Sequence, residues 1–323
     1  MTIIVEWENA IDVPDQWTRM AMDGLARELA EVGPRLPRRP RVMYLYDRHS
    51  VSPKAIEVTI EEAAPRLPEL ADLILTATDG LTYYQLKNYG VARAGTELSV
   101  MIDSDAVPQP GWLEAIIAPF DDPEVMAVGG FTMLGHDDFL SRAMALSWIF
   151  DLVGEGEATE RRKAIHVNNF AVRTEFFRAH PFPDLQAYKK QCVIWLRAIR
   201  SEGHRFVRTS KAMAIHAPHP GVKFLVWRAW TAGLDADFLA FHTRTSHSLG
   251  RFAYAFVDLA KSLTRAWYRI LFRAEAVEMP VWERPFALLV ALTYYLLRLV
   301  AQLGSSLTRH FDPLPTFQPM AKV

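Results

Sequence analysis

Short apolar runs alternate with longer segments of helical spacing over the first 130 residues of the chain. The strand-like runs, rich in apolar and β-branched residues, lie at 2–5, 41–46, 71–77, 97–102 and 125–132. The segments with apolar residues at helical spacing lie at 17–32, 83–94 and 111–120. This rhythm predicts an α/β fold with a mostly parallel sheet and helices on both faces. Ligands of such sheets bind at the carboxyl ends of the strands, so residues just after each run are the candidates for chemistry.

The pattern changes after about residue 222. The segment 251–273 is a long helical pattern that mixes Arg and Lys with Phe, Leu, Trp and Tyr, and 286–303 is almost wholly apolar. From Gly221 onward there are 12 Lys and Arg against 7 Asp and Glu. We predict one domain over 1–222, a helical region over 223–310 and a flexible tail over 311–323.

The C-terminal helices are candidates for membrane contact. A clean span needs ~20 apolar residues, and the run 286–303 is shorter than this and contains Arg298 and Gln302. The basic and aromatic residues of 251–273 favour a helix that lies on an anionic surface. The alternative is a soluble helical hairpin that packs on the rest of the chain or on a second subunit.

Composition narrows the function classes. The formal net charge is −1, so no global basic field points to nucleic acid. Cys192 is the single cysteine and has no partner for an internal disulfide, which fits a reducing compartment. Glu6 and Glu8 follow the start of the chain in place of a basic region, which argues against a cleaved signal peptide. We predict a cytoplasmic protein, at the inner face of the membrane if the C-terminal helices contact it.

Two carboxylates, Asp103 and Asp105, stand one residue apart at the end of a buried strand-like run. Oxygen ligands of this kind suit Mg²⁺ or Mn²⁺, which in turn bridges pyrophosphate oxygens and assists departure of a nucleoside diphosphate. The alternative for Asp-Ser-Asp is a turn or a helix N-cap. The sequence Pro-x-Pro-Gly-Trp-Leu that follows at 108–113 favours the metal site.

The segment 84–120 resembles the family 2 glycosyltransferases. Lys87-Asn88, Ala94-Gly95, Asp103-Ser104-Asp105 and Pro110-Gly111-Trp112-Leu113 stand in the order and spacing of that family, and the resemblance covers roughly residues 2–220. It implies a GT-A, Rossmann-like fold and a nucleoside diphosphate sugar donor. It also implies Mg²⁺ or Mn²⁺ as cofactor and a hydroxyl acceptor, either a saccharide or a lipid-linked one.

The resemblance also implies roles for single residues. Asp103 and Asp105 match the metal and pyrophosphate carboxylates, and His216, with His219 next in line, matches a histidine that completes the metal site. The nucleotide-sugar-binding positions by the same likeness are Glu8, Asp47, Lys87, Asn88, Asp103 and Asn169. For Glu8 and Asp47 a loop carboxylate is the alternative, for Asn169 a structural turn, and for Lys87 and Asn88 a solvated helix face.

The general base of the family is missing. Family members carry a Glu-Asp pair eleven to twelve residues before a helix-ending glycine, and here the count back from Gly203 reaches Gln191-Cys192. Neither side chain is an ordinary base. Asp184 is the candidate replacement, with Glu175 as a second; a branch with another catalytic arrangement is a further option.

Two other functions stay open. A chain without a base would be a catalytically degenerate, membrane-tethered partner protein that binds nucleotide sugars. A nucleotidyltransferase would need a glycine-rich phosphate loop near the N-terminus, and residues 6–16 contain no glycine. The sequence therefore favours an inverting, metal-assisted glycosyltransferase.

Overall fold

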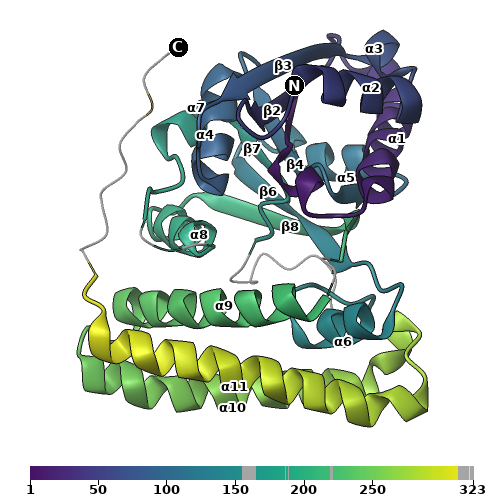
Figure 1. Cartoon of the computed structure of the whole chain (residues 1–323). Helices are drawn as coiled ribbons and strands as arrows, with labels where there is room; N and C mark the ends of the chain where they lie inside the picture. Colours follow the sequence, from purple (N-terminus) through teal and green to yellow (C-terminus); the bar gives the residue numbers. More distant parts are fainter. Residues whose placement is uncertain (155–164, 186, 188, 219–220, 312–319, 321–323) are drawn as a thin grey trace.

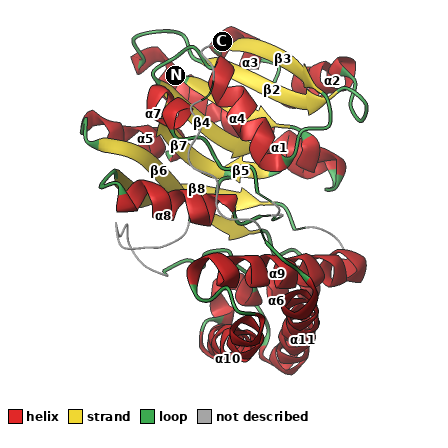
Figure 2. Cartoon of the chain, turned by 90° about the vertical axis from the view of Figure 1, so that its left-hand side faces the viewer, coloured by secondary structure: helices red, strands yellow, loops and turns green. Residues whose placement is uncertain are grey.

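The computed structural model describes residues 1–154, 165–185, 187, 189–218, 221–311 and 320. Its centre is an eight-stranded sheet of order β3-β2-β1-β4-β7-β6-β8-β5 (Figures 1 and 2). The strands are β1 (Thr2–Glu6), β2 (Arg41–Asp47), β3 (Asp72–Thr78), β4 (Leu98–Asp103), β5 (Ala106–Pro108), β6 (Val125–Leu134), β7 (Asn169–Arg173) and β8 (Arg205–His216). The first four pair in parallel, β6 pairs in parallel with β8, and the other contacts are antiparallel. The predicted α/β class and mostly parallel sheet are confirmed.

Helices cover both faces of this sheet. The α-helices of the first 201 residues are α1 (Asp15–Val32), α2 (Pro53–Ala63), α3 (Leu67–Leu70), α4 (Tyr83–Arg93), α5 (Trp112–Ile117), α6 (Phe139–Ser147), α7 (Thr174–Ala179) and α8 (Gln191–Ser201). Short 3-10 helices lie at Glu8–Ile11, Gly33–Arg35, Ala118–Asp121, Ala274–Val277 and Val281–Glu283.

Alternation along β1 divides the core into two layers. Ile3 packs with residues of α1, α2 and α5, whereas Ile4 packs on the opposite face with residues of α4 and α8. Successive strand residues point to opposite faces, so a strand with apolar residues at every position must be covered on both sides. The helical spacing at 17–32, 83–94 and 111–120 correctly located α1, α4 and α5 to within a few residues.

A layer of long helices lies under the β8 end of the sheet (Figures 1 and 2). It consists of α9 (Gly221–Thr243), α10 (Ser248–Phe272) and α11 (Arg284–Thr308), packed with α6 around a separate apolar cluster. The predicted boundary at residue 222 falls in the first turn of α9. Of the predicted tail 311–323, only Phe311 and Met320 are described, and Met320 N donates to Arg178 O at 2.8 Å.

Two of the arginines expected on a membrane-facing helix are buried inside this layer. Arg251 is 2% exposed and donates to Asp237 Oδ2 (2.9 Å) and Ser306 O (2.9 Å). Arg269 is also buried and donates to Phe150 O at 3.1 Å. The expectation that the basic residues of 251–273 face a lipid surface is wrong for these two, because each satisfies carbonyl or carboxylate groups that tertiary packing leaves without solvent.

Candidate functional site

Asp103, Asp105 and His216 meet at the centre of the sheet edge where β1 and β4 end. Asp103 is the last residue of β4, and β5, which begins at Ala106, pairs antiparallel with β8 so that Ala106 lies opposite His216. One ligand atom from each of the three side chains lies within 4.8 Å of the others, and all three residues are buried. Chain segments more than 100 residues apart thus converge on one small site.

Asp103 is held by an extended set of donors. Tyr83 OH donates at 3.0 Å and Asn9 Nδ2 at 3.0 Å, both to Oδ2, and the Lys87 ammonium forms a buried ion pair with Oδ1. Burial alone raises the pKa of Asp103, but the charges of Lys87 and then Lys189 outweigh it and the pKa ends below its usual range. Asp103 is therefore an ionised carboxylate in a fixed orientation. Lys87 is completely buried, so the alternative of a solvated helix face does not hold for it.

In the described part of the chain, Asp105 lacks the hydrogen-bond donors that surround Asp103. It is fully buried and neither carboxylate oxygen accepts a hydrogen bond from any described residue. Burial raises its pKa, against the opposing effect of His216. A buried carboxylate without donors is costly unless a cation or a proton compensates it.

His216 presents a nitrogen to Asp105. Its Nδ1 lies 2.8 Å from Ala217 O, and because a carbonyl only accepts, Nδ1 carries the hydrogen. In a neutral ring Nε2 then holds the lone pair, and it faces Asp105 Oδ2 at 3.5 Å. Lone pairs that face each other favour a cation between them, and carboxylate oxygens with one imidazole form a donor set that divalent ions accept. The residues present fit the metal that the sequence predicted.

Glu6 is a second buried carboxyl beside this site. It is fully buried at the end of β1, opposite Asp103 in the strand register, and neither oxygen has a hydrogen-bond partner among the described residues. Burial, followed by the charge of Asp103, raises its pKa well above the usual range. Glu6 is therefore a neutral acid over much of the pH range in which ordinary glutamates are ionised.

Replacing Glu6 by Gln is expected to remove a pH dependence of stability. Since the folded pKa lies above the unfolded one, the folded state binds more protons, and stability falls as pH rises through the folded pKa. The wild type should lose about 1.4 kcal/mol of unfolding free energy for each pH unit between the unfolded and the folded pKa of Glu6. The Glu6→Gln variant should keep its unfolding free energy over the same range. Thermal unfolding from about pH 5 to about pH 9 measures this, with the exposed Glu57→Gln as control. Parallel curves for Glu6→Gln and wild type would contradict a neutral Glu6.

A cavity of about 140 Å³ opens beside Asp103 and His216. One wall comes from α9, whose Phe224, Trp227 and Arg228 line it, so the C-terminal helical layer completes the site. A second cavity of about 470 Å³ adjoins it and shares Asn9, Asp12, Tyr83, Tyr84 and Lys189. Lys189 lies with Nζ 3.6 Å from the centroid of the Tyr83 ring. It was not predicted, because its position depends on a loop whose path the local pattern does not determine.

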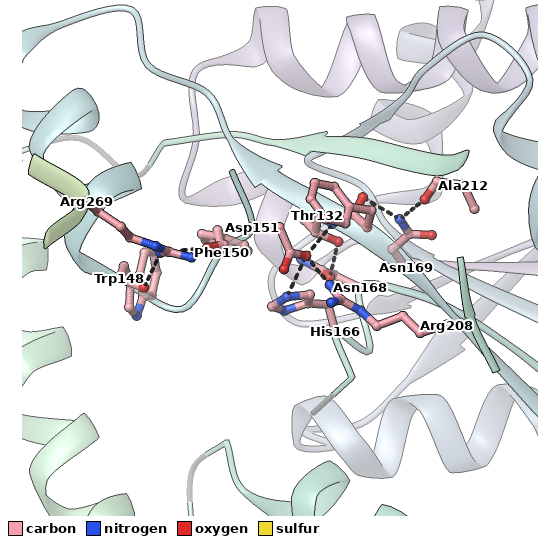
Figure 3. Close-up of polar contacts among 11 residues, drawn as sticks. Thr132, Trp148, Phe150, Asp151, His166, Asn168, Asn169, Arg208, Ala212 and Arg269 are labelled. Atoms are coloured by element: carbon pink, nitrogen blue, oxygen red, sulfur yellow. Dashed lines mark hydrogen bonds and ion pairs between the residues drawn. The ribbon is translucent and has the colours of Figure 1, made fainter. Parts of the chain in front are cut away.

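His166 lines the cavity beside Asp103 and His216, and it is paired with Asp151 (Figure 3). His166 Nε2 lies 3.2 Å from Asp151 Oδ2, and Asp151 also forms a buried ion pair with Arg208. Burial raises the pKa of Asp151, but His166 and Arg208 outweigh this and the pKa ends below the usual range. The Phe150 ring lies between the two histidines, 5.7 Å from the His166 ring and 5.1 Å from the His216 ring. Sequence reasoning missed this pair, since nothing local marks His166 and Asp151 as neighbours.

The residues at the usual base position are not bases here. Cys192 Sγ accepts a hydrogen bond from Tyr84 OH at 3.1 Å, and burial raises the pKa of this thiol. The side chain of Gln191 donates to Ala187 O at 2.6 Å. Asp184 is exposed, lines the second cavity and accepts from Gln85 Nε2 at 3.1 Å. Glu175 is 72% exposed, pairs with Arg178 and lines neither cavity.

Two asparagines that were predicted to bind the nucleotide sugar make hydrogen bonds inside the protein. Asn169 is completely buried, and its Nδ2 donates to Phe131 O and Ala212 O (Figure 3). Its Oδ1 accepts from Trp112 Nε1 at 2.8 Å. Asn88 bonds both the carbonyl and the N–H of Phe182. Asn169 uses both N–H groups and its oxygen inside the protein, so its role is structural. Asn88 uses one N–H group and its oxygen on Phe182, and its contact with the donor stays a prediction. Asn168, the neighbour of Asn169, lines the cavity instead.

The two predicted nucleotide carboxylates lie at the expected strand ends. Glu8 lines the second cavity, and burial raises its pKa. Asp47 ends β2 and accepts hydrogen bonds from His49 N and, at 3.0 Å, from Ser50 Oγ. These bonds, the one from His49 N first, lower the pKa of Asp47. Asp47 is thus an ionised loop carboxylate, and its role stays a prediction. His219 lies outside the described residues.

Comparison with known proteins identifies the family. Residues 74–180 match the family model described as glycosyl transferase family 2. This chain carries a family 2 glycosyltransferase domain. No curated protein sequence matches the chain.

Solved structures give the fold of this glycosyltransferase. The mannosyltransferase PcManGT from Pyrobaculum calidifontis, solved with GDP-Man and Mn²⁺, superposes with a TM-score of 0.55 at 19% identity, over 95% of this chain and 86% of that one. TarS 1-349 from S. aureus, solved with UDP, gives a TM-score of 0.49 at 12% identity, over 99% of both chains. The likeness to PcManGT confirms the predicted GT-A fold, and the family match over residues 74–180 supports the predicted enzyme class.

Proposed function

We propose that this glycosyltransferase moves a sugar from a nucleoside diphosphate sugar to a hydroxyl acceptor with inversion. The observation that carries the proposal is the buried Asp103–Asp105–His216 cluster at the wall of a cavity. The similar fold of PcManGT was solved with GDP-Man and Mn²⁺, which supports a nucleotide-sugar donor and a divalent ion here. Lys189 and Arg228 line the cavity and supply positive charge there, as a pyrophosphate requires.

Asp103, Asp105 and His216 would hold Mg²⁺ or Mn²⁺. When bound, such an ion neutralises charge on the departing diphosphate. The protein's own part is to keep Asp103 ionised through Lys87 and to keep water away from Asp105 by complete burial. Glu8 and Asp47, at the ends of the neighbouring strands, are the proposed contacts for the nucleotide.

The proposal is tested by titrating the full chain with a panel of nucleoside diphosphate sugars, including GDP-mannose and UDP-N-acetylglucosamine, in the presence of Mn²⁺. Calorimetry measures binding, and release of nucleoside diphosphate is assayed in the same samples. We expect metal-dependent binding and release for at least one donor. Binding without release for every acceptor supplied would favour the degenerate, donor-binding partner protein. Absence of binding to every donor would overturn the proposal.

His166 is the proposed general base. If Nε2 donates its hydrogen to Asp151 Oδ2 at 3.2 Å, Nδ1 is left with the lone pair that takes the acceptor proton. The His166 ring is only 11% exposed and lines the cavity that Asp103 and His216 also line. Asp184, the base that the sequence suggested, lines only the adjoining cavity and is already bonded to Gln85.

His166→Gln is expected to lower kcat by about 10²–10⁴-fold with donor affinity retained, because a general base acts on the acceptor and not on donor binding. Asp184→Asn is the matched comparison and should change kcat little. The reverse result, with loss in Asp184→Asn and not in His166→Gln, would assign the base to Asp184.

We also propose that the protein lies on an anionic membrane through the end of the α10–α11 hairpin. Large exposed side chains gather in this stretch of chain at Tyr268, Leu271, Phe272, Val281, Trp282 and Phe286. Arg273 and Arg284 stand among them. The stretch Val281–Thr308 is long and apolar enough to cross a membrane, but one face of α11 packs on α9 and α10. This placement favours a helix that lies on the surface, at the cytoplasmic face.

Vesicle co-sedimentation tests this surface. Burying each large apolar side chain contributes about 1.5–3 kcal/mol, so Phe272→Ser/Trp282→Ser/Phe286→Ser should weaken binding to phosphatidylglycerol-containing vesicles by more than about tenfold. Met20→Ser, an exposed apolar residue on α1, is the control and should bind as wild type. If the wild-type chain stays in the supernatant at low salt, the hairpin is a soluble one.

A further inference from the structure

A second cluster of metal-ligating side chains lies apart from the cavities. His180 follows the last residue of α7, and Glu202 and His204 flank Gly203 in the turn from α8 to β8. Their ligand atoms lie within 4.8 Å of one another. None of the three lines either cavity of the catalytic site. The cluster therefore needs an explanation of its own.

The hydrogen-bond pattern fixes which nitrogen of His180 faces the glutamate. Nδ1 lies 3.0 Å from Phe176 O, so Nδ1 carries the hydrogen. In a neutral ring the lone pair of Nε2 then faces Glu202 Oε2 at 3.3 Å. A lone pair opposite a carboxylate oxygen is repulsive without a cation between them. That cation is either a proton on His180 or a metal ion.

The spacing of the three atoms matches a metal site. Nε2 of His180 and Nε2 of His204 lie 3.3 Å and 3.5 Å from the same Glu202 oxygen. Zn²⁺ binds histidine and carboxylate at about 2.0–2.2 Å in tetrahedral geometry, which separates its ligand atoms by about 3.3–3.5 Å. Each histidine nitrogen thus stands from the Glu202 oxygen at the distance that a tetrahedral ion requires.

The surroundings hold both rings in place. The Phe176 ring stacks on His180 with centroids 4.6 Å apart and meets His204 edge-on at 4.8 Å. The bond from His180 Nδ1 to a backbone carbonyl is the kind of outer contact that orients zinc-bound histidines. The three side chains are 22%, 42% and 33% exposed, which leaves room for a water as fourth ligand.

We propose that His180, Glu202 and His204 form a binding site for Zn²⁺ or a similar first-row divalent ion. The ion would join the end of α7 to the α8–β8 turn. These two points lie at the ends of the chain segment 180–202, which carries Asp184 and Lys189 to the two cavities of the glycosyltransferase. The site would act as a clamp on that segment and does not depend on the proposed donor or acceptor.

The test is calorimetric titration of the full, chelator-stripped chain with Zn²⁺ alone, in an Asp105→Asn background that weakens the other cluster. We expect one ion per chain. Glu202→Gln and His204→Gln should each weaken binding at least about tenfold. The thermal midpoint should rise with Zn²⁺ in the Asp105→Asn chain and not in these two variants.

Glu175→Gln is the matched control and should bind Zn²⁺ fully, because Glu175 is a glutamate on α7, the helix that ends just before His180, and is not part of the cluster. Co²⁺ in place of Zn²⁺ should give the absorption of a tetrahedral ion, which a structural role of the side chains would not produce. No binding in the Asp105→Asn chain would overturn the proposal and leave a protonated His180 paired with Glu202. Binding unchanged in both ligand variants would overturn it as well. If His204→Gln does not fold, the more exposed Glu202→Gln decides.

Discussion

Asp105→Asn is expected to abolish metal-dependent sugar transfer while leaving the fold intact. Removing one electrostatic contact to the developing charge typically costs about 10²–10³-fold in kcat. Asp105 offers two buried oxygens without hydrogen-bond partners, 3.5 Å from His216 Nε2 on one side, so its charge has no evident structural use among the described residues. Asparagine keeps the volume and removes the charge that burial disfavours.

The measurement combines turnover, Mn²⁺ affinity and thermal unfolding of the same samples. We expect transfer and Mn²⁺ binding to fall together, with the unfolding midpoint equal to or above that of wild type. Asp12→Asn, an exposed carboxylate on the rim of the same cavity, serves as control and should retain both activities. Full transfer by Asp105→Asn would show that the cluster is not the metal site.

Lys87→Met is expected to destabilise the protein by about 3–5 kcal/mol, the usual effect of removing one partner of a buried ion pair. Lys87 and Asp103 are 0% and 2% exposed. Without the Lys87 ammonium, Asp103 loses its ion-pair partner and keeps the neutral donors Tyr83 and Asn9 and the charge of Lys189. The loss comes from the uncompensated charge and not from lost packing, since methionine has a similar length.

The double variant Lys87→Met/Asp103→Asn distinguishes these causes. It should regain much of the stability, because no charge is then left buried and unpaired. Denaturant unfolding gives the free energies, and Lys54→Met, at an exposed lysine on α2, should change them by less than about 0.5 kcal/mol. A double variant no more stable than Lys87→Met alone would mean that Lys87 contributes through packing.

Predictions that rested on short stretches of chain succeeded. The short apolar runs at 2–5 and 41–46 and the helical spacing at 83–94 located β1, β2 and α4, because side-chain direction follows from backbone geometry within one element. The pair Asp103 and Asp105 was placed at a strand end for the same reason. A strand that ends in carboxylates must deliver them to the edge of a parallel sheet, wherever its neighbours lie.

Predictions that depended on the distant contact partners of a side chain were wrong or could not be made. Asn169 looked like a ligand contact, yet Trp112, Phe131 and Ala212 take its whole amide. Arg251 looked like a surface charge, yet Asp237 holds it in the interior. In both cases the local pattern showed a polar or charged side chain. It could not show which distant group hydrogen-bonds to that side chain or pairs with its charge.

The sequence by itself determined the strand and helix positions, the α/β class, and the carboxylates at the end of β4. The family resemblance placed His216 with them, and the tertiary structure brings the three side chains together. Only the tertiary structure decided that His166 pairs with Asp151 and that α9 forms one wall of the cavity. The physical reason is that hydrophobic periodicity acts within a few residues, whereas desolvation and hydrogen bonding of a buried group depend on which segments the sheet order brings together. Polar chemistry in the interior is set by neighbours that the chain meets only after folding.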